Sequence, residues 1–162
     1  MRVAIGSDHG GFGLKTALCR LLDDLGVEYR DFGTDSEEPV DYPDVIAPLA
    51  RAVSRGEFDR GIVLGGSGTG EAIVANKIRG IRCVQAANPV VARLGREHNN
   101  ANVISIGARV TTQEVAEACV REFLGAEFDG GRHIRRVAKI AALEAEEAAG
   151  AEEAAEAGEA GR

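Results

Sequence analysis

The chain has 162 residues, enough for one domain with a substantial core and too few for two ordinary domains. Its apolar fraction of 44% and charged fraction of 28% are those of a globular protein, and no window has the roughly 20 apolar residues of a membrane span. The net charge of -7 arises at the C-terminal end, where residues 144–162 hold seven Glu and one Arg, a net of -6, which leaves -1 for the rest. No basic stripe with interleaved aromatic residues is present, which argues against a nucleic-acid partner.

The N-terminus and the cysteines indicate a cytoplasmic protein. Residues 3–6 form a short strand-like run rather than the apolar segment and cleavage site of a signal peptide. Cys19, Cys83 and Cys119 are far apart, odd in number and in no CxxC pairing. This pattern predicts buried thiols rather than a disulfide framework or a zinc site. We therefore expect a cytoplasmic protein with no membrane segment.

Short runs rich in Val and Ile alternate with longer segments of helical period, which is typical of a parallel sheet with helices on both faces. The predicted strands are residues 3–6, 27–32, 61–64, 82–86 and 103–106. The predicted helices are residues 12–25, 43–55, 69–78, 89–97 and 112–124, and a last helix begins near residue 131. We predict an α/β fold, a Rossmann-like doubly wound five-stranded parallel sheet plus a C-terminal helix. Ligands bind beyond the carboxyl ends of the strands in this fold class.

The composition divides the chain into a domain and a tail. Residues 1–141 contain all the predicted strands and every motif described below. Residues 142–162 consist almost entirely of Ala, Glu and Gly. That composition favours helix but supplies no core, so we expect a frayed helix or disorder there and assign it no chemistry.

The loop after the first predicted strand reads Gly6-Ser7-Asp8-His9-Gly10-Gly11 and places an acid beside a histidine. It is not the dinucleotide-binding pattern GxGxxG, because Asp8 stands where that pattern needs glycine and its carboxylate would repel a pyrophosphate. His9 could bind an anion or transfer a proton, and Asp8 could orient a sugar hydroxyl. The loop alone leaves the alternative equally open, in which Asp8 caps a helix and His9 is a solvated neighbour.

The loop after the third predicted strand, GGSGTGE at residues 65–71, opens a helix. Its glycines allow several backbone N–H groups to converge on one anion, aided by the helix dipole. A nucleotide-binding P-loop needs Lys where Glu71 stands, so nucleotide hydrolysis is disfavoured. The combination suits proton abstraction beside a carbonyl, with Glu71 as base and the N–H groups stabilising an enediolate. A first-turn Glu considered alone more often only complements the helix dipole.

Two further segments offer groups for a sugar and a phosphate. His98 and Asn99 end the fourth predicted helix and could protonate a ring oxygen and hold hydroxyls, although a histidine there could equally cap the helix. Arg109 follows the fifth strand, and Arg132 and Arg136 lie four residues apart on one face of the last helix. Paired guanidinium groups suit a phosphate, while a short basic run by itself is usually a solvated face.

Together these segments resemble the ribose-5-phosphate isomerase B family, which also contains the galactose-6-phosphate isomerase subunits. The resemblance runs from residue 1 to near residue 143. Its motifs are GSDHGG at 6–11, DYPD at 41–44, GGSGTGE at 65–71, ANK at 75–77, REHNNAN at 96–102 and GGRHIRR at 130–136. It implies a Rossmann-like sheet, no cofactor, no metal, and a homodimer or a dimer of dimers whose active sites draw residues from both chains.

Within that family, one branch has a cysteine as base at the position of Gly65, and another has a glutamate at the position of Glu71. This chain resembles the glutamate branch, which leaves Cys83 without a role. The resemblance assigns the enediolate to Gly66, Ser67, Gly68 and Gly70, ring opening to Asp8 and His98, sugar contacts to Tyr42 and Asn99, and the phosphate to His9, Arg109, Arg132 and Arg136, with His133 beside them.

The activity that the resemblance implies is the interconversion of ribose 5-phosphate and ribulose 5-phosphate in the pentose phosphate pathway, formally an intramolecular oxidation–reduction. Segment 87–90, which varies among family members, could adapt the pocket to another sugar. Allose 6-phosphate, galactose 6-phosphate and tetrulose phosphates therefore stay open as substrates. A function of another class, non-catalytic binding of a sugar phosphate, needs neither a base nor a ring-opening group, so the presence of candidates for both favours catalysis.

Overall fold

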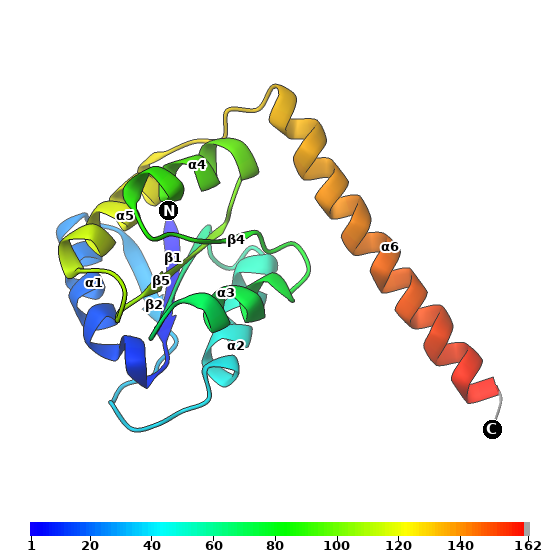
Figure 1. The fold of residues 1–162 in the computed structure, drawn as a ribbon, viewed down its shortest axis with the longest axis horizontal. Helices are drawn as coiled ribbons and strands as arrows, with labels where there is room; N and C mark the ends of the chain where they lie inside the picture. The colour runs from blue at the N-terminus through cyan, green and yellow to red at the C-terminus, as the bar shows by residue number, and fades with distance from the viewer. Residues whose placement is uncertain (161–162) are drawn as a thin grey trace.

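A computed structural model describes the backbone of residues 1–160 and the side chains of residues 1–151. Strands and helices alternate along this part of the chain, as Figure 1 shows. The strands are β1 (Arg2–Ser7), β2 (Glu28–Asp31), β3 (Arg60–Gly65), β4 (Cys83–Gln85) and β5 (Val103–Gly107). The helices are α1 (Phe12–Asp24), α2 (Tyr42–Ser54), α3 (Thr69–Asn76), α4 (Pro89–Asn99), α5 (Gln113–Gly125) and α6 (Arg132–Ala160), and a 3₁₀ turn spans His9–Gly11.

The five strands form one parallel sheet in the order β2-β1-β3-β5-β4. The fold prediction is confirmed: this is a doubly wound, Rossmann-like α/β sheet followed by a long C-terminal helix. The chain runs outward from β1 to β2, returns to β3 on the other side of β1, passes to β4 at the opposite edge, and then places β5 between β3 and β4. This reversal leaves a crevice beyond the carboxyl ends of β1 and β3, the usual ligand position in such sheets.

The central strands are buried on both faces, and most of their buried side chains are apolar. On one face, Ile5, Leu64 and Ile104 pack against buried side chains of α1, α4 and α5. On the other face, Ala4 and Val63 pack against α2 and α3. Burying one Leu or Ile side chain fully contributes about 1.5–3 kcal/mol, so these two layers hold the strand ends firmly in place. The loops at the carboxyl edge therefore extend from a rigid base.

α6 extends away from the sheet as a long rod in Figure 1. It contacts the edge of the sheet near β4, where the Glu144 carboxylate accepts a hydrogen bond from the Gly80 N–H at 3.1 Å. Ile140 and Leu143 line a cavity of about 440 Å³ beside Cys83 but stay 41% and 56% exposed. The prediction of a coreless tail at 142–162 extends beyond the described side chains and stays a prediction.

Among the described residues, no helix combines the length and the apolar character that crossing a bilayer requires.

Candidate active site

The crevice at the carboxyl edge of the sheet is a cavity of about 400 Å³. Three of the loops that form its wall follow strands: Asp8 comes after β1, the glycine-rich loop after β3, and Arg109 after β5. Tyr42, the first residue of α2, adds a fourth side. The lining residues are Asp8, Tyr42, Gly66, Ser67, Gly70, Glu71, Arg109 and Val110. The structure thus brings together a large part of the predicted site in one chain.

Glu71 is the third residue of α3 and is only 3% exposed, although it lines the cavity. Burial raises the pKa of its carboxyl group above the ordinary 4.5, and the nearby Asp8 raises it further, while the backbone N–H of Glu71 acts in the opposite direction. A carboxylate with a raised pKa accepts a proton more readily, as a general base requires. The sequence could not give this direction, because a helix terminus and burial shift the pKa in opposite senses.

The last residue of β3, Gly65, leaves room for the Glu71 carboxylate. A Cβ atom on Gly65 would lie 1.8 Å from Oε1 and 2.2 Å from Cδ of Glu71. A side chain at position 65 and the observed carboxylate therefore occupy the same space. A cysteine at position 65 and a glutamate at position 71, the two alternatives that the sequence resemblance implies for the base, would therefore exclude one another in this arrangement.

Asp8 both caps a turn and lines the cavity. Its Oδ1 accepts a hydrogen bond from the Gly11 N–H at 3.0 Å and so caps the 3₁₀ turn at the end of β1. The two interpretations of Asp8 are therefore compatible, because the cap fixes a carboxylate that the cavity also contacts. His9 lies next to Asp8 but outside the cavity lining, and its Nδ1 accepts from the Val40 N–H at 3.3 Å. A neutral His9 therefore carries its proton on Nε2.

Two flat side chains lie against glycines of the loop after β3. The Arg109 guanidinium is seated on Gly66, where a Cβ atom would be 3.4 Å from Cζ. The Tyr42 ring is seated on Gly70, where a Cβ atom would be 2.9 Å from the ring. Arg109 thus presents a positive charge at the cavity wall, and Tyr42 presents an amphipathic ring. The Tyr42 position depends on the missing side chain of Gly70, whereas a Cβ atom on Gly66 would meet Arg109 at an ordinary contact distance.

Cys83 lies outside the cavity that Glu71 lines and is poorly suited to act as a base. It begins β4 at the edge of the other cavity, next to α6, and burial raises the pKa of its thiol well above the usual range. A thiol with a raised pKa carries little thiolate at neutral pH.

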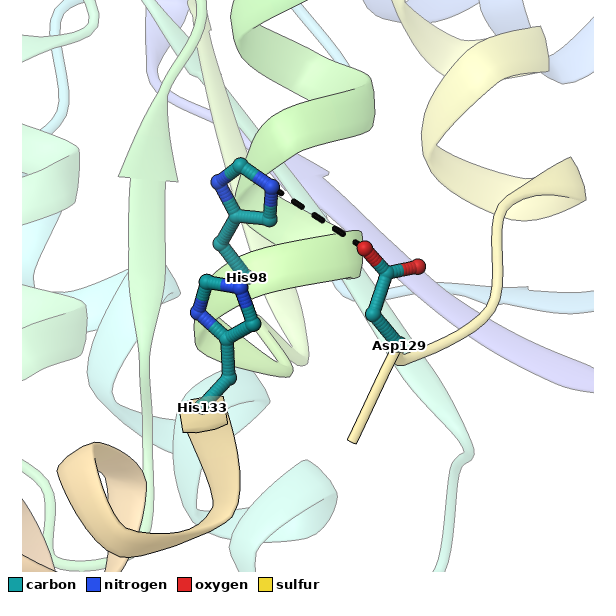
Figure 2. A group of neighbouring side chains, drawn as sticks. All are labelled: His98, Asp129 and His133. Atoms are coloured by element: carbon teal, nitrogen blue, oxygen red, sulfur yellow. Dashed lines mark ion pairs between the residues drawn. The ribbon is translucent and has the colours of Figure 1, made fainter. Parts of the chain in front are cut away.

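The remaining predicted residues lie outside this cavity. α4 runs from the carboxyl edge of the sheet back to the amino edge, so His98 and Asn99, in its last turn, stand at the opposite edge from Glu71. Arg132, His133 and Arg136 begin α6 near that same edge. The His98 and His133 rings, drawn in Figure 2, are stacked. Their centroids are 4.3 Å apart and their planes differ by 5°. The predicted site is therefore divided into two groups that a single chain does not join.

Sequence reasoning missed Asp129, which lies beside the stacked histidines in Figure 2, with its Oδ2 at 3.9 Å from His98 Nε2. It also missed Val110, which lines the cavity and is 67% exposed. Val110 follows Arg109 directly, so its position after β5 was the available signal. Asp129 belongs to no predicted helix, strand or motif, so the sequence contained no signal for its position.

His98, Asp129 and His133 are of the kinds that bind metal ions, and their ligand atoms lie within 4.8 Å of one another. An imidazole nitrogen directs its lone pair in the plane of its ring, and the two stacked rings direct theirs in parallel rather than toward one point. His133 Nε2 also accepts a hydrogen bond from Arg132 Nε at 3.4 Å. Burial lowers the pKa of His133, as do the neighbouring His98 and Arg132. In this arrangement the donor set does not fit a metal ion.

A sequence model of the family described as Ribose/Galactose Isomerase matches residues 3–140. The chain belongs to the ribose/galactose isomerase family. It is 46% identical over 136 residues to ribose-5-phosphate isomerase B of Escherichia coli, which covers 84% of this chain and 91% of that protein. It is 41% identical over 133 residues to D-erythrulose-4-phosphate isomerase of Pectobacterium atrosepticum, which covers 81% of this chain and 87% of that protein.

A solved structure gives the same result. Ribose-5-phosphate isomerase B from Mycoplasma genitalium with bound ribulose-5-phosphate superimposes with a TM-score of 0.86 at 35% identity, over 90% of this chain and 97% of that one. The family resemblance of the sequence motifs is thereby confirmed. This chain is a sugar-phosphate isomerase of the ribose/galactose isomerase family.

Proposed function

We propose that this isomerase interconverts ribose 5-phosphate and ribulose 5-phosphate, with Glu71 as the base. The observation that carries the proposal is the buried Glu71 carboxyl group, with its raised pKa, in the wall of a cavity that the glycine-rich loop also lines. The names of the Escherichia coli and Mycoplasma genitalium relatives support this substrate pair.

The reaction requires one proton acceptor and one anion site. Glu71 removes the proton from C2 of the open-chain aldose, and the electrons of the broken C–H bond move through C1 onto the carbonyl oxygen O1. Backbone N–H groups of residues 66–70, with the Ser67 hydroxyl, stabilise the resulting enediolate. The protonated Glu71 then delivers the proton to C1, and the O2 proton moves to O1. Atoms and charge balance without any further reactant.

The second group of residues enters from another copy of the chain in this proposal. Because His98, Asn99, Arg132 and Arg136 stand at the opposite sheet edge from Glu71, a homodimer, or a dimer of dimers, is the simplest way to join both groups. His98 then assists opening of the furanose ring together with Asp8. Arg132 and Arg136 join Arg109 and His9 around the phosphate. The exposed Ile140 and Leu143 of α6 supply apolar surface for such a contact.

The base is tested by comparing Glu71→Gln with wild type in the conversion of ribose 5-phosphate. Glu114→Gln is the matched control, because Glu114 is also a first-turn glutamate, but of α5, and is exposed. We expect kcat to fall by at least about 100-fold for Glu71→Gln and to stay at the wild-type value for the control. Equal kcat values for the two variants would show that another group is the base.

A second substrate is favoured by one relative, the D-erythrulose-4-phosphate isomerase of Pectobacterium atrosepticum. The same base and anion site would act on a sugar with one carbon fewer. Measuring kcat/KM for ribose 5-phosphate and for D-erythrulose 4-phosphate decides between the two. A larger value for the shorter sugar would reassign the substrate and leave Glu71 as base.

The shared site is tested by mixing two inactive variants, Glu71→Gln and His98→Ala, under conditions in which subunits exchange. If each site takes Glu71 from one chain and His98 from the other, half of the dimers are mixed and each has one intact site of two. The mixture then regains about a quarter of wild-type activity. A mixture that stays as inactive as its components would place both residues in one chain.

A further inference from the structure

Two side chains on neighbouring strands hold the carbonyl groups of the glycine-rich loop. Gln85 of β4 donates from Nε2 to the carbonyl oxygen of Ser67 at 2.9 Å and to Oγ1 of Thr69 at 3.0 Å. Ser105 of β5 is fully buried and donates from Oγ to the carbonyl oxygen of Gly68 at 2.6 Å. Gln85 and Ser105 are paired in the register of β4 and β5, so they stand side by side.

These contacts determine where the N–H groups of the loop point. In a planar trans peptide, the C=O and N–H bonds point in opposite directions. The Ser67 carbonyl shares its peptide plane with the Gly68 N–H, and the Gly68 carbonyl shares its plane with the Thr69 N–H. Binding both carbonyls to β4 and β5 turns both N–H groups away from these strands. The Thr69 N–H accordingly donates to Oγ of Ser67, which lines the cavity, at 3.2 Å.

The orientation matters because the opposite one would repel an anion. A flip of either peptide would exchange an N–H donor for a carbonyl oxygen and so present negative partial charge to an enediolate. Glycine tolerates many backbone conformations, so these peptides can flip once their carbonyl groups are released. Gly68 is at φ 77°, a left-handed conformation in which a glycine loses little energy. The two side-chain hydrogen bonds therefore supply the restraint that the glycines lack.

Close packing supports the same view. A Cβ atom on Gly107, the last residue of β5, would lie 2.3 Å from the carbonyl oxygen of Ser67. The Ser67 peptide thus lies directly on the end of β5. The Gly68 carbonyl also accepts a hydrogen bond from the Ala72 N–H at 3.1 Å. The Ser67 carbonyl accepts its side-chain hydrogen bond from Gln85.

We propose that Gln85 and Ser105 are positioning residues of the anion site, which act by holding the peptides of Ser67 and Gly68 with their N–H groups toward the developing enediolate. The inference rests on the proposed function, because it assigns these N–H groups to a negatively charged intermediate. Neither side chain lines the cavity. They act through the loop and not on the substrate itself.

The test uses Ser105→Ala and Gln85→Met, with Ser54→Ala as the matched control. Ser54 Oγ donates to the carbonyl oxygen of Arg79 at the same 2.6 Å, but at the end of α2 and away from the cavity. The readouts are kcat and KM for ribose 5-phosphate, the melting temperature, and affinity for two ligands. One ligand is a phosphorylated hydroxamate, a planar mimic of the enediolate, and the other is inorganic phosphate.

We expect kcat to fall about 10- to 100-fold for Ser105→Ala and for Gln85→Met, which is less than the loss of a whole oxyanion donor. Affinity for the hydroxamate should fall by a similar factor, because a transition-state mimic reports the same interactions. KM and the affinity for inorganic phosphate should change less than about twofold. Ser54→Ala should match wild type throughout. Gln85 is exposed, so its variant keeps a folded core even if Ser105→Ala is unstable.

Two results would overturn the inference while leaving the proposed function intact. One is a folded pair of variants whose kcat and hydroxamate affinity equal those of Ser54→Ala. The other is a parallel loss of hydroxamate and phosphate affinity, which would indicate general loosening of the cavity. By contrast, a wild-type protein that isomerises no sugar phosphate refutes the proposed function first and the inference with it.

Discussion

Gly65→Ala tests whether the place of the Glu71 carboxylate depends on an absent side chain. The added methyl carbon would lie 1.8 Å from Oε1, 2.2 Å from Cδ and 2.7 Å from Oε2 of Glu71, and real Cβ atoms do not approach other heavy atoms within 3.0 Å. The carboxylate must therefore move by at least 1.2 Å, the difference between 3.0 and 1.8 Å. A misplacement of about 1 Å at a reacting group costs about 100-fold in rate. We expect kcat to fall by about that factor or more.

Stability should change far less than activity, because the side chain of Glu71 can rotate toward the cavity. Overpacking of this kind costs about 1–3 kcal/mol in the free energy of unfolding. The measurements are kcat, KM and urea unfolding of Gly65→Ala. Gly13→Ala is the control, since a Cβ atom on Gly13, within α1, meets no heavy atom within 4 Å. It should keep the wild-type kcat and gain up to about 1 kcal/mol from helix propensity. A kcat for Gly65→Ala equal to that of Gly13→Ala would refute the reasoning.

Three further outcomes follow from buried charges. In a pH profile, kcat/KM should fall on the acid side with an apparent pKa above the ordinary 4.5, because burial raises the pKa of Glu71 and the proposed base acts only when deprotonated. An apparent pKa at or below 4.5 contradicts this. Because its pKa is raised, Glu71 binds its proton more tightly in the folded protein than in the unfolded chain, so stability is lost as pH rises through the folded pKa. Glu71→Gln should therefore melt at a higher temperature than wild type at neutral pH. This gain in melting temperature should vanish below pH 4.5. Lys15→Met should lose about 1.5–3 kcal/mol of unfolding free energy in urea, because the Lys15 ammonium donates hydrogen bonds to the Asp31 carboxylate and to the Thr34 carbonyl and is only 1% exposed. Lys77 is exposed, so Lys77→Met should lose no unfolding free energy.

The elements could be predicted because their signals are local. The strand predicted at 103–106 is β5, Val103–Gly107, and the helix predicted at 112–124 is α5, Gln113–Gly125. Thr112 caps that helix by accepting from the Val115 N–H. Capping residues and apolar periodicity act within a few positions of the chain, so sequence reveals them.

The division of the site could have been foreseen from topology, though not from residue types. A residue that follows a parallel strand lies at the carboxyl edge, and a residue that ends the next helix lies at the amino edge. Asp8 and Arg109 belong to the first kind and His98 to the second. Residue chemistry alone grouped all three, because histidine and arginine suit a sugar phosphate wherever they lie.

The contacts of Gln85 and Ser105 could not be read from sequence at all. Both look like ordinary strand residues, and their function depends on the register between β4 and β5 and on a loop 16 to 37 positions away. The same holds for the space between Gly65 and Glu71, which exists only once β3 and α3 are packed. Such distances are fixed by tertiary packing, which a pattern along the chain does not contain.

The shared space of Gly65 and Glu71 also restricts how such an enzyme can evolve. A lineage that gains a cysteine at position 65 while it keeps Glu71 crowds both bases, because the Cβ atom already collides with the carboxylate. A lineage that loses Glu71 first has no base at either place. On the proposed function, neither single step leaves an uncrowded base, so we expect an exchange of catalytic base to need both substitutions together. On the proposed function, the two bases that the sequence resemblance implies, a cysteine at position 65 and a glutamate at position 71, therefore exclude one another within one chain.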